Sequence, residues 1–505
     1  MTRKRLPKDD FFDTINAQFI ALTYDDIRLR TGYSVVPPNE MSLESRFSRN
    51  VSLKIPIVAA AMDTVTEHRL AIALAKLGGL GIIHKNMEID EQAHEVARVK
   101  LHLNALIEKP ITVLETDTIE AILRRRVEKG YEFHTFPVLD SEGRLVGVLS
   151  RHDFGVCDTP SSLAKDVMSR ELITLSEGAE LDRAYEVMKK EKKKVLPLIS
   201  QGGMLAGMYV LSDVRRIREA RSGSSKYNLD ARGQLRVGAA VDVDDALSRA
   251  ERLVRKKVDV LVIDKAHGDS PLVFETLHEL KRMYPSLDVV LGNISEPESA
   301  KRLLEAGADG IKVGQGPGSI CTTRIIAGVG CPQVTAVYNC SKIADEYGVP
   351  VCADGGLRFS GDIPIAIGAG ASSVMMGNML AGTEESPGKV TLWKGRQCKT
   401  YRGMGSLKAL EESLGSRGRY DQEEGATLIP EGVESRVPYK GPLVKVLKQY
   451  LGGLKRGMGY VGAGSIDELR EKAMFWRITD AGRRESHPHD VEVTEEAPNY
   501  PGGQQ

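Results

Sequence analysis

One pattern constrains the fold of this chain more than any other: a short apolar run, a turn with glycine or aspartate, and an amphipathic helix, repeated in that order. Short continuous apolar runs of this kind are typical of buried parallel strands. Their ranges are Ile57–Ala60, Gly79–His84, Leu235–Val241, Val258–Ile263, Val289–Leu291, Gly310–Val313, Pro350–Ala353 and Ser373–Met376. Helical patterns separate most of them, as at Asp244–Lys256, Glu296–Ala306 and Thr335–Tyr347. Eight strand–helix units predict an α/β fold, and a closed parallel (β/α)8 TIM barrel rather than an open sheet.

Length and composition set outer limits on the organisation. A chain of 505 residues is too long for one compact core, so we expect more than one domain. The 69 acidic and 69 basic residues cancel, which favours neither nucleic acid nor a membrane as primary partner. We identify no secretory signal and no run near the roughly 18 apolar residues of a membrane span. The six cysteines form no C-x-x-C pair, which argues against zinc and disulfides and fits a cytoplasmic location.

The gap between the second and third strands is too long for a single connection and contains an internal repeat. Phe136–Asp153 recurs as Leu196–Asp213, with the same interval between proline and the final aspartate. This repeat resembles a tandem pair of CBS motifs over about residues 105–222. The resemblance implies ATP or GTP bound between the halves, with Asp153 and Asp213 at matching ribose positions. Val210 replaces the Ser150 of the first copy, so a purely structural module stays an alternative.

The domain prediction therefore has three parts. Residues 1–104 form the first part of the barrel and residues 105–222 the inserted module. Residues 223–505 form the rest of the barrel.

A glycine-rich loop with a single cysteine follows the sixth strand. Three glycines lie within Gly314–Gly318 and free the backbone to point polar groups at a ligand. Cys321 follows, close to Arg324 in sequence, and a cysteine becomes a nucleophile when nearby positive charge favours its thiolate. The pattern is not the dinucleotide fingerprint G-x-G-x-x-G, because Ser319 takes the place of the third glycine. The simpler alternative is a tight turn with a half-buried cysteine.

Polar and glycine residues follow most of the other predicted strands as well. They are Met62-Asp63, His84, Asp264, Asn293, Asp354-Gly355-Gly356 and Gly377-Asn378. Barrel enzymes keep their chemistry at the C-terminal ends of the strands, and the turns after the last two strands often bind phosphate. The pattern predicts a phosphate-bearing ligand here, although each residue alone could be an ordinary turn or cap.

Six motifs resemble one enzyme family, that of inosine-5′-monophosphate (IMP) dehydrogenase. They are Ala306–Gly314, Gly316–Arg324, Ala353–Gly356, Gly382–Pro387, Tyr401–Ser406 and Arg436–Lys440. The resemblance runs from Leu22 to about Tyr500. It implies oxidation of IMP to xanthosine monophosphate (XMP) with NAD as cofactor, in guanine nucleotide synthesis.

The resemblance also assigns roles, which we state as expectations. Cys321 is the nucleophile at purine C2, and Thr323, Arg419, Tyr420 and Glu431 are its catalytic partners. Ribose and phosphate are held by Ser319, Asp354, Gly355, Gly356, Gly377, Asn378 and Tyr401. The purine is lined by Met62, Met404, Gly405 and Glu431, and the nicotinamide riboside by Asp264, Asn293 and Gly314. A K⁺ ion is held by the carbonyls of Gly316, Gly318 and Cys321 and by Glu485, Ser486 and His487 of a neighbouring subunit in a homotetramer, which could pair into an octamer.

The polar, glycine-rich segment from Trp393 to Pro442, here called the flap, is longer than usual loops and predicts a mobile lid or disorder. The Arg419-Tyr420 pair of the family lies in it. Several residues depart from the family pattern: Lys265, Ala266, Gln315, Asn378 and Asp421.

Two other functions remain open. One is GMP reductase, which shares the barrel and the cysteine loop; we expect such enzymes to lack the CBS insert and an Arg-Tyr flap. The other is a catalytically idle nucleotide-sensing scaffold, against which the presence of Cys321, Thr323, Arg419 and Tyr420 argues.

Overall fold

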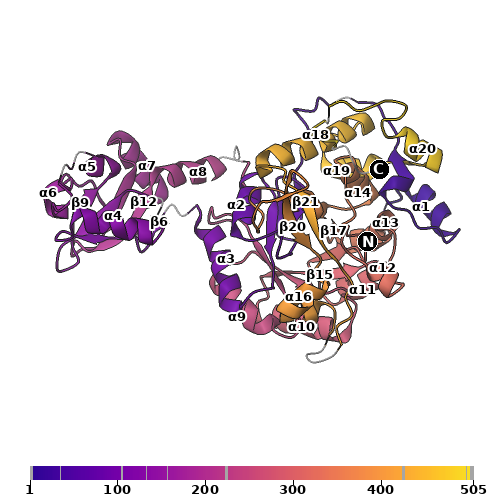
Figure 1. Cartoon of the computed structure of the whole chain (residues 1–505), viewed down its shortest axis with the longest axis horizontal. Helices are drawn as coiled ribbons and strands as arrows, with labels where there is room; N and C mark the ends of the chain where they lie inside the picture. Colours follow the sequence, from indigo (N-terminus) through magenta and orange to yellow (C-terminus); the bar gives the residue numbers. More distant parts are fainter. Residues whose placement is uncertain are drawn as a thin grey trace. The chain divides into compact units, whose positions relative to one another are not determined.

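The structure is a computed structural model and describes residues 4–34, 36–103, 106–131, 133–155, 157, 159–221, 226–422, 427–495 and 497–500. It divides into two compact units (Figure 1). The barrel unit comprises Met1–His102, Lys226–Asp230 and Leu235–Gln505, and the insert unit comprises Leu103–Ser225 and Ala231–Gln234.

Eight parallel strands close the barrel in the order β13-β14-β15-β16-β17-β18-β4-β5. Their bounds are β4 Ile57–Ala59, β5 Leu80–Ile83, β13 Gly238–Val241, β14 Val260–Asp264, β15 Asp288–Ile294, β16 Gly310–Val313, β17 Val351–Asp354 and β18 Ser373–Met376. Each falls in or overlaps one of the eight predicted ranges. The predicted TIM barrel is confirmed.

Helices cover the outside of the barrel (Figure 1). They are α2 His68–Lys76, α3 Ile89–Leu101, α9 Ala246–Arg255, α10 Pro271–Met283, α11 Pro297–Glu305, α13 Gln333–Tyr347 and α14 Asp362–Ala369. Most bury one apolar stripe, such as Val273, Leu277 and Leu280 of α10. Proline occupies the first helical position of α10 and α11, where its missing N–H costs nothing. Gly348, in the left-handed conformation, ends α13.

A β-hairpin closes the amino-terminal end of the barrel. Its strands are β2 Ser45–Arg46 and β3 Ser52–Leu53. Phe47, between them, is fully buried in one cluster with interior side chains such as Val260 and Val290. Asp288, which opens β15, accepts hydrogen bonds from Ser48 Oγ at 2.6 Å and Asn50 N at 2.8 Å. With this end plugged, the carboxyl ends of the strands are left for a ligand.

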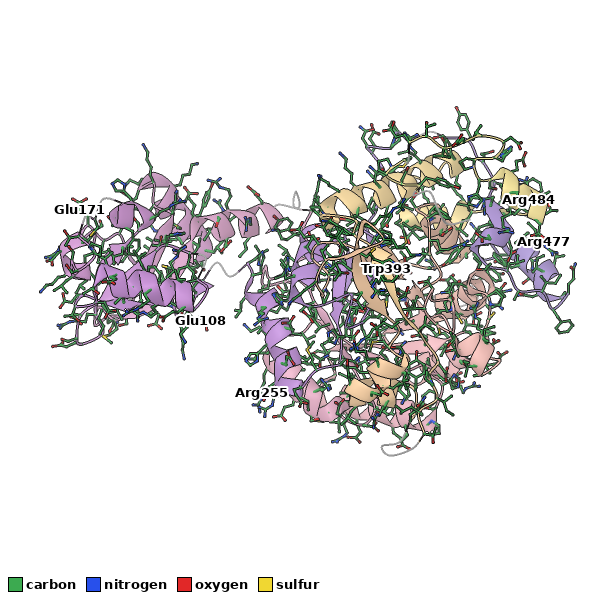
Figure 2. All side chains as sticks on the ribbon, in the orientation of Figure 1. Glu108, Glu171, Arg255, Trp393, Arg477 and Arg484 are labelled. Carbon is green, nitrogen blue, oxygen red and sulfur yellow. The ribbon has the colours of Figure 1, made fainter. Side chains whose placement is uncertain are left out.

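The described part of the flap contains strands and helices, which the sequence did not predict, and its mobility stays a prediction. After α15 (Asn378–Ala381) it contains β20 Arg396–Arg402, paired antiparallel with β19 Thr391–Trp393 and β21 Glu434–Pro438. Trp393, labelled in Figure 2, ends β19. The Arg436 guanidinium lies over its ring, 4.4 Å from the ring centroid. Two short helices, α16 Leu407–Glu412 and α17 Leu414–Arg419, lie between β20 and β21.

The two ends of the barrel unit pack together. The N-terminal elements are α1 Asp9–Asn16, the 3₁₀ turn η1 Tyr24–Asp26 and β1 Ile27–Leu29, and the C-terminal ones are α18 Leu443–Val461, α19 Ile466–Lys472, β22 Phe475–Arg477 and α20 Asp480–Glu485. β1 pairs antiparallel with β22. Phe12 stacks on Tyr338 of α13 with ring centroids 4.1 Å apart.

The insert unit repeats one arrangement twice. The first copy contains β7 Val113–Leu114, α4 Ile119–Glu128, β8 Phe136–Leu139, β9 Leu145–Leu149, α5 Arg151–Gly155 and α6 Ala164–Val167. The second contains β10 Leu175–Ser176, α7 Leu181–Lys190, β11 Val195–Ile199, β12 Leu205–Val210 and α8 Leu211–Arg221, and β6 Leu106–Ile107 pairs with β12. Both hairpins carry the same irregularity, at Val138/Leu139 and at Leu198/Ile199. The sequence repeat is therefore also a structural repeat.

Within the described part of the chain, no helix combines the length and apolar character needed to cross a membrane.

Replacing residues 105–222 by a short Gly/Ser linker should leave the barrel unit folded. The segments flanking the insert already meet inside that unit, where Lys100 Nζ lies 3.0 Å from Asp230 Oδ2 and 2.6 Å from Asp259 Oδ2. We expect a cooperative thermal transition by circular dichroism within about 5 °C of the barrel transition of the full chain. Aggregation, or loss of that transition, would mean that the barrel needs the insert to fold.

Candidate active site

A cavity of about 400 Å³ opens at the carboxyl ends of the barrel strands. Most of the predicted site residues line it: Met62, Asp264, Asn293, Gly314, Gly316, Gly318, Ser319, Cys321, Thr323, Asp354, Gly355, Gly356, Gly377, Asn378, Tyr401, Met404, Arg419, Tyr420 and Glu431. They come from the ends of six barrel strands (β4, β14, β15, β16, β17 and β18), from the cysteine loop and from the flap. Gly405 lies directly against Tyr420, where a Cβ would come within 2.6 Å of Tyr420 Cζ.

The cysteine loop holds its sulfur beside a hydroxyl. Cys321 N donates to Gly318 O at 3.0 Å, and Cys321 Sγ lies 3.1 Å from Thr323 Oγ1 at the start of α12 (Thr323–Ile326). Thr322 N donates to Glu431 O at 2.9 Å, which ties the loop to the flap. The tight turn depends on Gly316, at φ +77°, where a Cβ would collide with Arg324.

Cys321 is more exposed than two of the three cysteines that follow it most closely in the chain. Its side chain is partly exposed on the cavity, whereas Cys340 and Cys352 are fully buried. Burial raises the pKa of Cys331 to about 11 and that of Cys352 to about 12, and raises the pKa of Cys340 well above its ordinary value. These three thiols are therefore poor nucleophiles at neutral pH.

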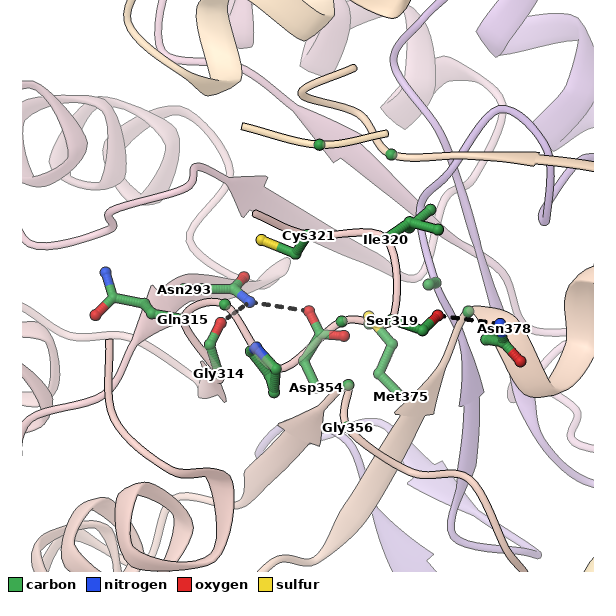
Figure 3. Close-up of a pocket in the computed structure, with 18 of the residues that line it drawn as sticks. Asn293, Gly314, Gln315, Ser319, Ile320, Cys321, Asp354, Gly356, Met375 and Asn378 are labelled. Atoms are coloured by element: carbon green, nitrogen blue, oxygen red, sulfur yellow. Dashed lines mark hydrogen bonds between the residues drawn. The ribbon is translucent and has the colours of Figure 1, made fainter. Parts of the chain in front are cut away.

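One end of the cavity gathers hydroxyls, an amide and glycines. Asn378 Nδ2 donates to Ser319 Oγ at 3.0 Å (Figure 3). A Cβ on Gly377 would lie 2.9 Å from Tyr401 Oη, so glycine lets this hydroxyl approach the turn. Burial raises the pKa of Tyr401, which keeps its hydroxyl protonated as a donor. Donors of this kind beside a helix N-terminus suit a phosphate group.

A buried lysine at the centre of the site was not predicted. Lys312 of β16 pairs with Asp264 Oδ1 at 2.9 Å and donates to Asp354 Oδ2 at 2.7 Å and to Asn293 Oδ1. Asn293 Nδ2 in turn donates to Gly314 O at 2.6 Å and to Asp354 Oδ2 at 3.0 Å (Figure 3). The signal available in the sequence was a lysine inside an otherwise apolar strand.

The part of the flap around α17, residues 413–422, reaches into the cavity. Arg419 Nη1 forms an ion pair with Asp264 Oδ2, and Ala266 N donates to Arg419 O at 2.9 Å. Arg419 Nε is buried and, within the described part of the chain, has no hydrogen-bond acceptor, so it is available to a ligand. Burial raises the pKa of Tyr420.

Four of the departures from the family pattern, Lys265, Ala266, Gln315 and Asp421, meet near the end of β14. Lys265 Nζ donates to Asp421 Oδ1 and Gly418 O. Gln315 Nε2 lies 3.0 Å from His267 Nδ1 and donates to Ala266 O at 3.3 Å. Ala266 takes part through its backbone: its carbonyl accepts from Gln315, and its N–H donates to Arg419 O. Asn378, the remaining departure, bonds Ser319 as described above.

The predicted cation residues separate into two places. Gly316, Gly318 and Cys321 share one loop, whereas Glu485, Ser486 and His487 are not among the residues that line the cavity in the described chain. Glu485 ends α20, and Ser486 N donates to Gly482 O at 3.1 Å. His487 Nδ1 lies 2.8 Å from Tyr500 Oη.

Comparisons with known proteins identify the family. The family described as IMP dehydrogenase / GMP reductase domain matches residues 21–489. The chain belongs to this family. Inosine-5′-monophosphate dehydrogenase of Aquifex aeolicus is 49% identical over 95% of this chain and 97% of its own length. The Bacillus subtilis protein of the same name is 44% identical over 95% of this chain and 97% of its own.

A solved structure from the other branch of the family corrects one expectation. GMP reductase of Trypanosoma brucei, in complex with guanosine 5′-monophosphate, superposes with a TM-score of 0.85 at 41% identity. It covers 94% of this chain and 98% of its own. The insert unit is too large to fall in the uncovered remainder, so the expectation that GMP reductases lack this insert is wrong. The insert therefore accompanies at least one GMP reductase and does not distinguish the two reactions.

Proposed function

We propose that this chain oxidises IMP to XMP with NAD as hydride acceptor, in the synthesis of guanine nucleotides. Its relatives from Aquifex aeolicus and Bacillus subtilis carry the name of that activity. The observation that carries the proposal is that Arg419 and Tyr420 of the flap line the same cavity as Cys321. Hydrolysis of a covalent intermediate needs a proton acceptor near the nucleophile, and the flap supplies candidates for it.

In the first half of the reaction, Cys321 acts as the nucleophile. Its thiolate forms a bond to purine C2, the C2–H electron pair leaves as hydride to the nicotinamide, and a covalent thioimidate remains on Cys321. Ser319, Asn378 and Tyr401 would hold the phosphate, and Asp354, beside Asn293 and Lys312, would hold the ribose. Met62 and Met404 would provide apolar surface for the base.

In the second half, water replaces the sulfur. Water attacks C2, gives one proton to a base, and Cys321 leaves as thiolate to release XMP. Arg419, with Tyr420 beside it, would take this proton. Thr323, 3.1 Å from Cys321 Sγ, and Glu431, whose carbonyl anchors the adjacent Thr322, would form a second, slower route.

Asp264, Asn293 and Gly314 fit the nicotinamide riboside, since they present a carboxylate, an amide and a backbone carbonyl at one wall of the cavity. In this structure Arg419 pairs with Asp264. A dinucleotide and Arg419 would therefore use the same carboxylate in turn, and hydride transfer would precede entry of the 413–422 segment.

GMP reduction is the second candidate, favoured by the match to the Trypanosoma brucei enzyme. That reaction releases ammonia and needs no hydrolysis of a thioimidate. It gives no role to a proton acceptor in the flap, so the position of Arg419 favours IMP oxidation.

Replacing Arg419 by alanine should separate hydride transfer from hydrolysis of the thioimidate. We expect the first burst of NADH within about twofold of the wild type, while steady-state turnover falls about 10²- to 10⁴-fold. Acid-trapped enzyme–XMP adduct should accumulate, as measured by rapid mixing and mass spectrometry. Cys321→Ala is the control: it should bind IMP yet give neither burst nor adduct. A lost burst in Arg419→Ala without adduct would rule out a hydrolytic role.

We also propose a K⁺ site on the cysteine loop. The carbonyls of Gly316, Gly318 and Cys321 are hard oxygen donors on one short loop, and Gly316 has a positive φ that glycine adopts readily. Glu485, Ser486 and His487 lie outside this chain's own cavity, which fits donation from a neighbouring subunit of a homotetramer, with further pairing into an octamer left open.

Replacing K⁺ by Li⁺, which is too small for such a carbonyl site, should lower turnover about three- to tenfold. Glu485→Gln should weaken activation by K⁺ in the same assay without changing the NADH burst at saturating K⁺. Equal turnover in the two salts would contradict a cation site on this loop.

For the insert unit we propose binding of ATP or GTP. Its doubled arrangement supports this, with Asp153 and Asp213 at matching positions in the two copies. Asp153 Oδ2 accepts from Ser150 Oγ at 2.7 Å, whereas Asp213 Oδ1 faces Arg216 Nη1 at 3.5 Å. Either nucleotide should raise the melting temperature of the full chain and not that of the 105–222 deletion; equal responses would contradict the proposal.

A further inference from the structure

Lys265 is a buried lysine that directly follows β14. Its side chain is 3% exposed, and Nζ donates to Asp421 Oδ1 and to Gly418 O of the flap. Asp242 Oδ1 lies 3.7 Å away on the barrel side. The backbone of Lys265 is fixed as well, because Lys265 N donates to Gly292 O at 2.9 Å and its carbonyl accepts from Asn293 N at 2.8 Å. The lysine therefore presents its charge to the flap from a rigid base.

The contacts between the end of β14 and α17 follow one another in register. Asp264 pairs with Arg419, Ala266 N donates to Arg419 O, and Lys265 bonds the residues on either side, Gly418 and Asp421. Two ion pairs of opposite polarity thus flank one backbone hydrogen bond. Such an arrangement permits a single alignment of the segment, because a shift by one residue would misplace both pairs.

The side chains on the barrel side of this contact, Lys85 and Asp242, are charged and pack directly against Gly418. Lys85 Nζ donates to Asp242 Oδ2, and a Cβ on Gly418 would lie 2.5 Å from that same oxygen. Burial lowers the pKa of Lys85 to about 8. The positive charges of Arg419 and Lys265 act in the same direction, whereas the negative charge of Asp242 opposes it. Glycine at 418 lets the segment approach these side chains, and any larger residue would hold it away.

Asp421 suits its position in two ways. Its φ of +51° is a left-handed conformation that Asp and Asn adopt more readily than most residues. Its side chain is 68% exposed, so the carboxylate is paired on one side and open to water on the other. Gln315 accepts from Ser295 Oγ at 2.6 Å, donates to the Ala266 carbonyl and lies 3.0 Å from His267 Nδ1, so it supports the chain that follows Lys265.

We propose that Lys265 and Asp421 form an electrostatic latch that holds the 413–422 segment in the cavity and so sets how often Arg419, rather than a dinucleotide, occupies Asp264. The kinetic part rests on the proposed function; the latch itself does not. Lys265 is a positioning residue here, since it acts through the segment and touches no reacting atom.

Hydrogen exchange in the ligand-free protein tests the latch without reference to activity. Ala266 N–H reports it directly, because its acceptor is Arg419 O. In Asp421→Asn, which keeps the backbone preference and removes the charge, exchange at Ala266 should rise about five- to twentyfold. Lys265→Met should give a similar rise, and the double variant should be no worse than the stronger single one, as expected for two partners of one interaction.

Glu411→Gln is the matched control, because it removes one negative charge from an exposed position of α16. It should leave exchange at Ala266 unchanged. Unchanged exchange in Asp421→Asn would overturn the latch, and so would fully additive effects of the two single variants. If Lys265→Met fails to fold, exchange at Ala266 in Asp421→Asn alone still tests the latch, because Asp421 is exposed.

The kinetic readout then separates positioning from general destabilisation. In Asp421→Asn the NADH burst should be unchanged, while kcat and the KM for NAD both fall about threefold or more because the segment leaves Asp264 more often. A fall in kcat with a raised KM would contradict the latch. If the wild type does not oxidise IMP at all, the proposed function fails, and the exchange experiment still stands as the test of the latch.

Discussion

The carboxyl end of the barrel depends on the pairing of buried lysines with aspartates at the ends of neighbouring strands. Lys312 lies between Asp264 and Asp354 and is 2% exposed. Removing one partner of such a buried pair costs about 3–5 kcal/mol, because the remaining charge is left without water or counterion. The lysine therefore fixes three strand ends in a single arrangement. It also orients two carboxylates at the cavity wall, where a ribose hydroxyl or a cation can use them.

The flap forms ion pairs of the same kind with the barrel. Arg419 brings a positive charge to Asp264, and Asp421 brings a negative charge to Lys265, so these two side chains together add no net charge to the cavity. When the segment leaves, Asp264 keeps its ion pair with Lys312, and Lys265 keeps Asp242 nearby as a counterion. An enzyme that needs one site for hydride transfer and then for hydrolysis can in this way exchange ligands at Asp264 without stranding a buried charge.

Much of the fold could be predicted from the sequence, because buried parallel strands such as Ser373–Met376 are short apolar runs between turn residues. The glycines and the cysteine of the β16 loop were also visible, since their spacing is local. Lys312 was not, because a strand pattern does not say which side chain faces the interior. The pairing of Lys265 with Asp421 joins residues far apart in the chain, and the strands of the flap were hidden by polar residues such as Gln397 and Lys399.

Offering the purified chain both reactions of its family tests the central claim most directly. With IMP and NAD, we expect a rise in absorbance at the NADH band, XMP as product, and loss of both in Cys321→Ala. With GMP and NADPH, we expect no consumption of the reduced cofactor and no ammonia. NADPH oxidation with ammonia release, and no NADH from IMP, would contradict the account and assign the chain to the reductase branch of the family.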